Sequence, residues 1–206
     1  YKDRCLNVDK KYQYGMAQNE DIYFQCMEAR NKYYDAMPNV VNDYMKKIND
    51  IMKTDYKPFN YYGASDAKNI IVAMGSVTDT IKEVVKKLDN VGLIEVHLYR
   101  PFSKEYFLNV LPKSVKNIAV LDRTKEAGST GEPLYLDVCS ILKNKNINIY
   151  GGRFGLSSKN TTPDEIYSVY KMLEENPHHN FTIGINDDVT NLSLKPSHIE
   201  IKNEAK

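Results

Sequence analysis

The stretch of sequence that decides the fold is KNIIVAMGS, residues 68–76. Its five consecutive apolar residues, beginning at Ile70, do not alternate with polar ones, so both faces of the segment should be buried. This pattern is typical of a central strand in a parallel sheet. Gly75 then allows a tight turn, and Ser76 is a candidate helix cap with Asp79 at capping-box spacing.

An amphipathic helix is expected directly after this turn, because apolar residues recur on one stripe from Val77 to Leu88. The strand–turn–helix unit then repeats along the chain. Further strands are predicted at residues 58–63, 93–98, 117–121, 147–150 and 181–185, and helices are predicted after Ser103, from Pro133 and from Pro163. Alternation of this kind predicts an α/β architecture with right-handed crossovers and helices on both faces of the sheet.

The first quarter of the chain is organised differently. A helix capped by Asn19 is expected to run to about Asn31, and a second helix is expected to begin near Pro38, with no strand between them. We therefore expect residues 1–56 to be the connector and tail of a preceding domain, residues 57–194 an α/β domain, and residues 195–206 a charged flexible tail. Because the chain starts at Tyr1 and not at Met, we expect it to be a piece of a longer protein.

The bulk properties exclude several classes of protein. The net charge of +1 predicts no attraction to nucleic acid or to an acidic membrane surface. No apolar run approaches the ~20 residues needed to cross a bilayer, so we expect a soluble protein. The three cysteines, Cys5, Cys26 and Cys139, are far apart and form no CxxC pair, so no metal site is predicted and the setting is expected to be reducing.

Residues that follow the strands are the natural candidates for a site, because ligands of open α/β sheets bind at the carboxyl ends of the strands. Three interpretations stay open for the cations found there: local pairing with Asp122 or Glu126, an interface with an acidic face of another domain, and a small anion site. The candidate residues for anion binding or for an interface are Gly75, Ser76, Arg100, Arg123, Lys125 and Arg153.

No catalytic constellation is evident. Gly75-Ser76 fits neither a dinucleotide fingerprint nor a phosphate loop and is expected to form a tight turn. The 151–155 segment is expected to be a plain loop, with a backbone nest as the alternative. Side chains that often carry chemistry have ordinary interpretations here: His97 packs within a strand, His178 and His179 are solvated, Cys139 is an inert thiol, and Asp187-Asp188 form a turn. The residues alone thus predict a scaffold or interaction domain.

A set of segments in this order closely resembles pyruvate:ferredoxin oxidoreductase over nearly the whole chain. Small departures include Ala127, where the family usually has Pro, and Ser157, where it usually has Gly. The resembling segments are QNEDIYFQ (18–25), YYGA (61–64), IVAMGS (71–76), LYRPF (98–102), IAVLDRTKE (118–126), GEPLY (131–135), GGRFGL (151–156) and FTIGINDDVT (181–190).

The resemblance implies a fold like the transketolase C-terminal domain: a three-layer α/β/α domain preceded by a helical N-terminal extension. Its mostly parallel five-stranded sheet would have the order 1-3-2-4-5, with strand 1, residues 59–62, antiparallel. The switch point would lie between the strand at 70–74 and the strand at 118–121.

The resemblance also implies what the parent enzyme does. Such enzymes decarboxylate pyruvate with thiamine diphosphate and Mg²⁺, transfer the acetyl group to coenzyme A, and pass electrons through [4Fe-4S] clusters to ferredoxin. Relatives with a fused flavoprotein reductase, which carries FAD and FMN, deliver electrons to NADP. We expect a homodimeric enzyme of anaerobic metabolism, in the cytoplasm or in an anaerobic energy organelle, although the chain carries no targeting signal.

This chain is expected to contribute no catalytic residue, because it lacks the Gly-Asp-Gly thiamine motif and the cluster cysteines of that family. Its expected partners are other domains of the same polypeptide, with ferredoxin or a fused reductase as the partner of the parent. The alternative is a stand-alone module that binds an anionic ligand at Arg100, Arg123 and Arg153.

Overall fold

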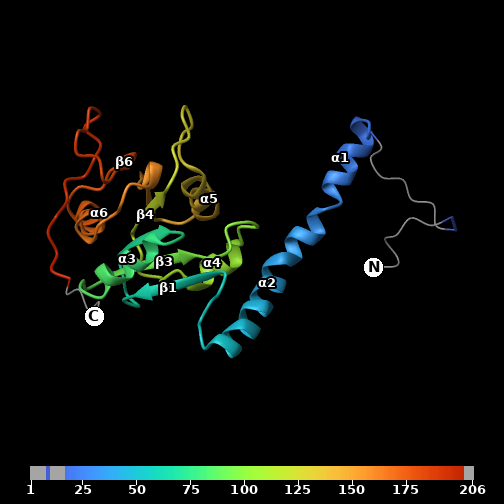
Figure 1. The fold of residues 1–206 in the computed structure, drawn as a ribbon, viewed down its shortest axis with the longest axis horizontal. Helices are drawn as coiled ribbons and strands as arrows, with labels where there is room; N and C mark the ends of the chain where they lie inside the picture. The colour runs from blue at the N-terminus through green and yellow to red at the C-terminus, as the bar shows by residue number, and fades with distance from the viewer. Residues whose placement is uncertain (1–7, 10–16, 202–206) are drawn as a thin grey trace. The chain divides into compact units, whose positions relative to one another are not determined.

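The computed structural model describes residues 8–9 and 17–201 (Figure 1). Cys5 and the last five residues of the expected tail lie outside the described residues. The chain divides into one unit of residues 1–37 and a second unit of residues 38–206. The second unit holds the whole sheet.

Two helices precede the sheet, α1 (Glu20–Glu28) and α2 (Asn31–Met52). The predicted cap of α1 is confirmed, because Asn19 Oδ1 accepts a hydrogen bond from the backbone N–H of Ile22 at 3.0 Å. The prediction that the second helix begins near Pro38 is wrong, since α2 begins at Asn31 and passes through this proline. A proline in a helix interior removes one backbone hydrogen bond but keeps a helical φ, and the apolar stripe of α2 continues on both sides of it.

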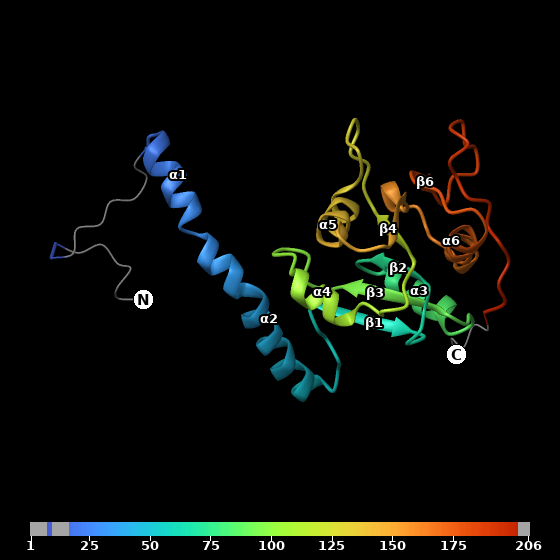
Figure 2. The ribbon, with the colours of Figure 1, turned by 180° about the vertical axis from the view of Figure 1, so that it is seen from behind.

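The sheet has six strands in the order β1-β3-β2-β4-β5-β6, and Figures 1 and 2 show the ribbon from the front and from behind. β1 runs antiparallel to β3, and the other pairs are parallel. The predicted order of the first five strands and the antiparallel first strand are thereby confirmed, and β2 and β4 flank the switch point. The strands are β1 (Phe59–Gly63), β2 (Asn69–Ala73), β3 (Val91–Val96), β4 (Asn117–Asp122), β5 (Asn148–Arg153) and β6 (Phe181–Thr182).

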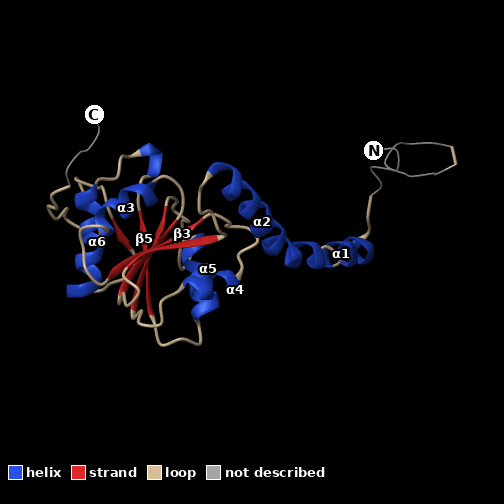
Figure 3. Ribbon diagram, turned by 90° about the horizontal axis from the view of Figure 1, so that it is seen from below, coloured by secondary structure: helices blue, strands red, loops and turns tan. Residues whose placement is uncertain are grey.

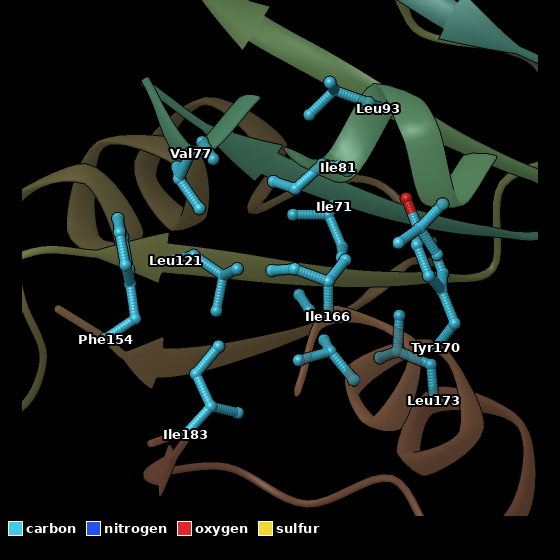
Figure 4. Close-up of a cluster of buried hydrophobic side chains, with 14 of the residues drawn as sticks. Ile71, Val77, Ile81, Leu93, Leu121, Phe154, Ile166, Tyr170, Leu173 and Ile183 are labelled. Atoms are coloured by element: carbon cyan, nitrogen blue, oxygen red, sulfur yellow. The ribbon is translucent and has the colours of Figure 1, made fainter. Parts of the chain in front are cut away.

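Helices cover both faces of this sheet, as Figure 3 shows. The helices are α3 (Val77–Val85), α4 (Lys104–Val110), α5 (Pro133–Leu142) and α6 (Pro163–Glu175), with a short 3₁₀ turn at Leu156–Ser158. β2 explains the arrangement: Ile71 and Ala73 pack under α3 and α6, and Ile70 and Val72 pack on the side of α4 and α5. The unbroken apolar run of β2 therefore serves two cores, and Figure 4 shows the first of them.

Helix caps account for most of the local turns. Ser103 accepts a bond from the Tyr106 N–H at 3.4 Å, and Thr162 and Glu165 form the predicted capping box at the start of α6. The predicted cap at Ser76 is wrong, because its side chain makes no capping bond. The backbone N–H of Thr78 instead donates to the Gly75 carbonyl oxygen at 3.0 Å, which closes the turn.

The end of β5 differs from the prediction. The loop expected at 151–155 is wrong for its first three residues, because β5 continues to Arg153. A Cβ on Gly152 would lie 2.2 Å from Cζ of the buried Phe181, so glycine lets β5 approach that ring closely. The last strand is shorter than predicted: β6 ends at Thr182, and Gly184 turns the chain away with a φ of +87°.

Part of the expected flexible tail has specific contacts. The backbone N–H groups of Ser197 and Ile199 bond to Asp164 at 3.2 and 3.0 Å, and Ile201 packs against the core under α6. Within residues 8–9 and 17–201, no helix has the length and apolar character needed to cross a membrane.

Candidate functional site

The connection between β4 and α5 fixes the loop that carries two of the candidate cations. β4 ends at Asp122, which is 4% exposed and accepts bonds from the backbone N–H groups of Leu134 and Tyr135 at 3.0 and 3.1 Å. These amides open α5 and have no acceptor within the helix. Burial raises the pKa of Asp122, and the two amide bonds only partly counter that effect. The intervening loop, residues 123–132, is therefore held at both ends.

Arg100 follows β3 and is bound to α5. Its Nη1 lies 2.7 Å from Asp137 Oδ2, and its guanidinium lies 3.9 Å from the centre of the Tyr99 ring. Gly75 and Ser76 are exposed in the turn between β2 and α3. Arg100 is thus part of one local structure, and Gly75 and Ser76 are part of another.

Arg123, Lys125 and Arg153 come together around the segment that follows β5. Arg123 Nε donates to the Gly155 carbonyl oxygen at 2.9 Å. Lys125 Nζ and Arg153 Nη1 lie 3.7 and 3.6 Å from the same oxygen of Glu132, a carboxylate that is 3% exposed. Two cations, Lys125 and Arg153, therefore flank one buried acid, and this group carries a net positive charge.

The acidic partners of the cations are not those expected from sequence. Pairing with Asp122 or Glu126 is wrong, because the structure pairs Arg100 with Asp137, and Arg153 and Lys125 with Glu132. Asp122 is occupied at the start of α5, where its oxygens accept the helix amides. Local pairing nevertheless accounts for much of the charge at this edge of the sheet.

A pocket of about 390 Å³ opens beside this cluster, at the carboxyl ends of β5 and β6. Lys125, Arg153 and Lys159 contribute cations to its lining. Thr182 also lines it, and its Oγ1 is buried without a hydrogen-bond partner. An apolar interior with positive charge beside it suits an apolar group that bears negative charge, or an apolar surface with an acidic border. The apolar lining residues are Phe154, Leu156, Ile183, Ile185 and Leu192.

A smaller pocket of about 290 Å³ shares Lys125, Arg153 and Asn180 with the first and adds His179. His179 is exposed, as expected of a surface residue, but its ring is not free. Its Nδ1 accepts a bond from the Gly151 N–H at 2.9 Å, and the ring lies 4.7 Å from that of Tyr135. Burial lowers the pKa of His179, so the imidazole is neutral at pH 7.

The side chains with catalytic potential have structural surroundings. Burial raises the pKa of the Cys139 thiol, which keeps it protonated and unreactive at neutral pH. Asp188 accepts bonds from Thr190 and from the Ser193 N–H within its own loop. Across the part of the chain that the structure describes, no three His, Cys, Asp or Glu side chains are placed to hold a metal ion.

One charged cluster was missed by sequence reasoning. Glu95 is buried in β3, where its carboxylate accepts a bond from Thr78 at 2.5 Å and lies 2.9 Å from Lys82 Nζ and 3.3 Å from His97 Nε2. Burial raises the pKa of Glu95, but these neighbours outweigh it and hold the pKa below its ordinary value. His97 lies just past the end of β3, not within it. An acid inside an apolar strand was the signal available in the sequence.

The centre of the chain matches a family model, and nearly the whole chain is similar to parts of longer proteins. Residues 67–166 match the model of the family described as pyruvate:ferredoxin oxidoreductase core domain II. Pyruvate-flavodoxin oxidoreductase of Enterobacter agglomerans is 50% identical over 98% of this chain, and pyruvate:ferredoxin oxidoreductase of Moorella thermoacetica is 49% identical over 95% of it. Pyruvate dehydrogenase [NADP(+)] of Cryptosporidium parvum is 44% identical over 94% of it.

These relatives are much longer than this chain. The matched region is 18% of the Enterobacter protein, 17% of the Moorella protein and 11% of the Cryptosporidium protein. The similarity runs through α1 and α2 as well as the sheet, because it covers nearly all of this chain.

Proposed function

We propose that this chain is a structural and interaction part of a larger pyruvate oxidoreductase, because residues 67–166 match the model of pyruvate:ferredoxin oxidoreductase core domain II. The observation that carries the proposal is a match of nearly the whole chain, at 50% identity, to 18% of a pyruvate-flavodoxin oxidoreductase. Residues 57–194 form the transketolase C-terminal-like domain in this proposal, and residues 1–56 connect it to the domain before it.

The parent enzyme would convert pyruvate and coenzyme A to acetyl-CoA and CO₂. It would use thiamine diphosphate with Mg²⁺, and it would pass electrons through [4Fe-4S] clusters. The names of the relatives give flavodoxin, ferredoxin and NADP⁺ as acceptors, so the acceptor differs among proteins that share this domain.

The residues of this chain fit a role beside that chemistry and not within it. Asp122 and Glu132 are bound to helix amides or to cations, and His179 is bound to backbone. The described residues offer no ligand set for Mg²⁺ or for a cluster. We propose that other domains of the polypeptide hold the cofactors and that the parent is a homodimer.

The pocket after β5 is the proposed contact site for one of those domains. Its apolar lining includes Leu156 and Ile185, which are 44% and 47% exposed in this chain. Exposed apolar patches beside charged residues commonly mark interfaces between domains. Arg123 and Lys125, which are exposed, would face the acidic border of the neighbour, and the buried Arg153 would add its charge from below.

A second candidate function is a stand-alone module that binds an anion at the same place. The net positive charge around Glu132 and the unpartnered Thr182 hydroxyl favour it. The pairing of Arg100 with Asp137 and of Arg153 with Glu132 speaks against it, because these cations already have acidic partners.

Calorimetric titration of this chain separates the two candidates. The ligands are coenzyme A, thiamine diphosphate and inorganic phosphate, added one at a time. The interaction-domain proposal predicts no saturable heat from any of them. Saturable binding that is lost in Arg123→Ala, and retained in Lys113→Ala at the opposite edge of the sheet, would establish the second function in its place.

A further inference from the structure

Helix α2 leaves a line of large apolar side chains in solvent. Val40, Tyr44, Ile48, Ile51 and Met52 are between 46% and 77% exposed. We call these five residues the α2 apolar face. All of them lie in the second unit of the chain, which begins at Pro38.

The five side chains share one side of the helix. With about 100° of rotation per residue, they fall within an arc of about 120°. The charged residues Asp43, Lys46 and Asp50 fall on the other side, where Lys46 pairs with Asp43 at 3.1 Å. A helix that is apolar along one stripe and polar along the other is built to bury the stripe.

This exposure is not the scattered kind that any protein surface shows. Single exposed apolar residues are common, but a continuous row over more than three turns of helix marks an interaction surface. The two apolar cores on either side of the sheet are complete without these residues. Whatever covers the α2 apolar face must therefore come from outside these cores.

The partner that covers the α2 apolar face can be inferred from the chemistry of the face and from the length of the relatives. No charged residue lies within the face. Only Lys47 borders it, and its Nζ lies 4.8 Å from the centre of the Tyr44 ring. Paired helices that associate with a second copy commonly carry charges along both borders of the apolar seam, which set partner and register. The nearly uncharged border here fits a broad apolar surface.

The relatives are long enough to supply such a surface from the same polypeptide. The Enterobacter relative matches 98% of this chain, so the match includes α2, yet that region is only 18% of the protein. In that relative, the region that corresponds to this chain is accompanied by several times its own length of other chain. This setting favours another domain of the same polypeptide as the partner.

We propose that the α2 apolar face docks onto an uncharged apolar surface of another domain of the same polypeptide. The proposal rests on the proposed function, because it needs a larger parent. It adds to that function a second contact surface, on the connector and apart from the pocket after β5. The connector is then a docking element and not a flexible link.

Cysteine labelling tests the proposal in two matched settings. Ile48→Cys lies in the face, and Lys46→Cys, on the opposite side of the same helix turn, is the control. Each variant is made in this chain and in the full-length polypeptide, and the rate of maleimide labelling at the substituted position is read by peptide mass spectrometry. In this chain both positions should label at similar rates. In the full-length polypeptide, labelling at position 48 should slow at least tenfold, and labelling at position 46 should not change.

Other outcomes overturn the proposal. Equal, fast labelling at both positions of the full-length polypeptide would show that nothing covers the face. Protection that disappears when the full-length protein is diluted to monomers would show that a second copy covers it. Because a cysteine substitution could itself disturb docking, hydrogen exchange of the α2 amides is also measured in the unsubstituted proteins. The α2 amides should exchange more slowly in the full-length protein than in this chain. Pyruvate turnover by the same full-length sample tests the proposed function separately. Failure of the docking proposal can thus be distinguished from failure of the proposed function.

Discussion

Replacement of Asp122 tests how the carboxyl edge of the sheet is held together. The carboxylate is 4% exposed, and its two oxygens accept the backbone N–H groups of Leu134 and Tyr135 at 3.0 and 3.1 Å. Asp122→Ala removes both acceptors. Because these amides open α5, no other backbone group of the helix can replace the lost bonds.

The cost follows from the two unpaired amides. A buried donor left without a partner costs about 1–3 kcal/mol, so two would cost about 2–6 kcal/mol. Burial already disfavours the charged carboxylate, as its raised pKa shows, and its removal recovers part of that cost. We therefore expect Asp122→Ala to lower the free energy of unfolding by about 2–4 kcal/mol. Asp122→Asn keeps one acceptor oxygen and should lose about half as much.

Urea denaturation followed by far-UV circular dichroism measures both variants. With a slope of about 2 kcal/mol per molar urea, the expected loss moves the midpoint of Asp122→Ala down by about 1–2 M. A midpoint within 0.2 M of the unsubstituted chain (roughly 0.4 kcal/mol) would refute the role assigned to these bonds. Equal losses in the Ala and Asn variants would refute it as well, since only one of them keeps an acceptor.

The difference in stability between the unsubstituted chain and Asp122→Asn is predicted to depend on pH. Because burial raises the pKa of Asp122, the folded state binds its proton more tightly than the unfolded state does. The contribution of this carboxyl group to stability is therefore largest below its ordinary pKa of 3.8 and is lost as pH rises through the folded pKa. The stability of the unsubstituted chain, relative to Asp122→Asn, should fall over that window and be flat above it. An increase with pH would contradict the assigned environment.

Three further substitutions probe other parts of the account. Gly152→Ala should cost about 1–3 kcal/mol by pushing a Cβ into Phe181, and the double variant with Phe181→Leu should lose less in urea denaturation than the sum of the two single changes. Burial raises the pKa of Glu95, but neighbours that include Lys82 outweigh burial and bring this pKa below 4.5. The Glu95 carboxylate therefore contributes to stability above pH 4.5, and this contribution is lost as pH falls through the folded pKa. Thermal melts should show Glu95→Gln less stable at pH 7 by about 1–3 kcal/mol, with the difference shrinking below pH 4.5; a constant difference would be contrary to the assignment. Ser157 has a φ of +53°, and Ser157→Gly should raise the free energy of unfolding by about 0.5–1 kcal/mol; a decrease would show that the serine side chain is needed there.

Much of the fold could be predicted from the sequence because the decisive signals are local. The apolar run of β2 specifies a strand buried on both faces, and the Thr162 capping box specifies the start of α6. Where a local signal was ambiguous, prediction failed. Pro38 is a good residue at the start of a helix, but α2 continues through it because its apolar stripe begins earlier. Glycine at position 152 favours a turn by composition, but Gly152 lies in β5, where it packs closely against the ring of Phe181, 29 positions later in the chain.

The candidate site was predictable in outline only. The topology places Arg123 and Arg153 at one edge of the sheet, and the structure brings them together there. Their partners could not be predicted, because Glu132 reaches Arg153 only through the path of a ten-residue loop, residues 123–132. The Glu95 cluster was equally hidden, since its carboxylate meets Lys82 across the contact between α3 and β3.

The most direct test of the central claim is pyruvate turnover measured on this chain and on the full-length polypeptide side by side. The assay follows reduction of a redox dye that depends on both pyruvate and coenzyme A, under anaerobic conditions and with thiamine diphosphate and Mg²⁺ supplied. The account predicts turnover by the full-length polypeptide and none by this chain at the same molar concentration. Turnover by this chain alone, or a full-length polypeptide that is loaded with its cofactors and ignores pyruvate, would contradict it.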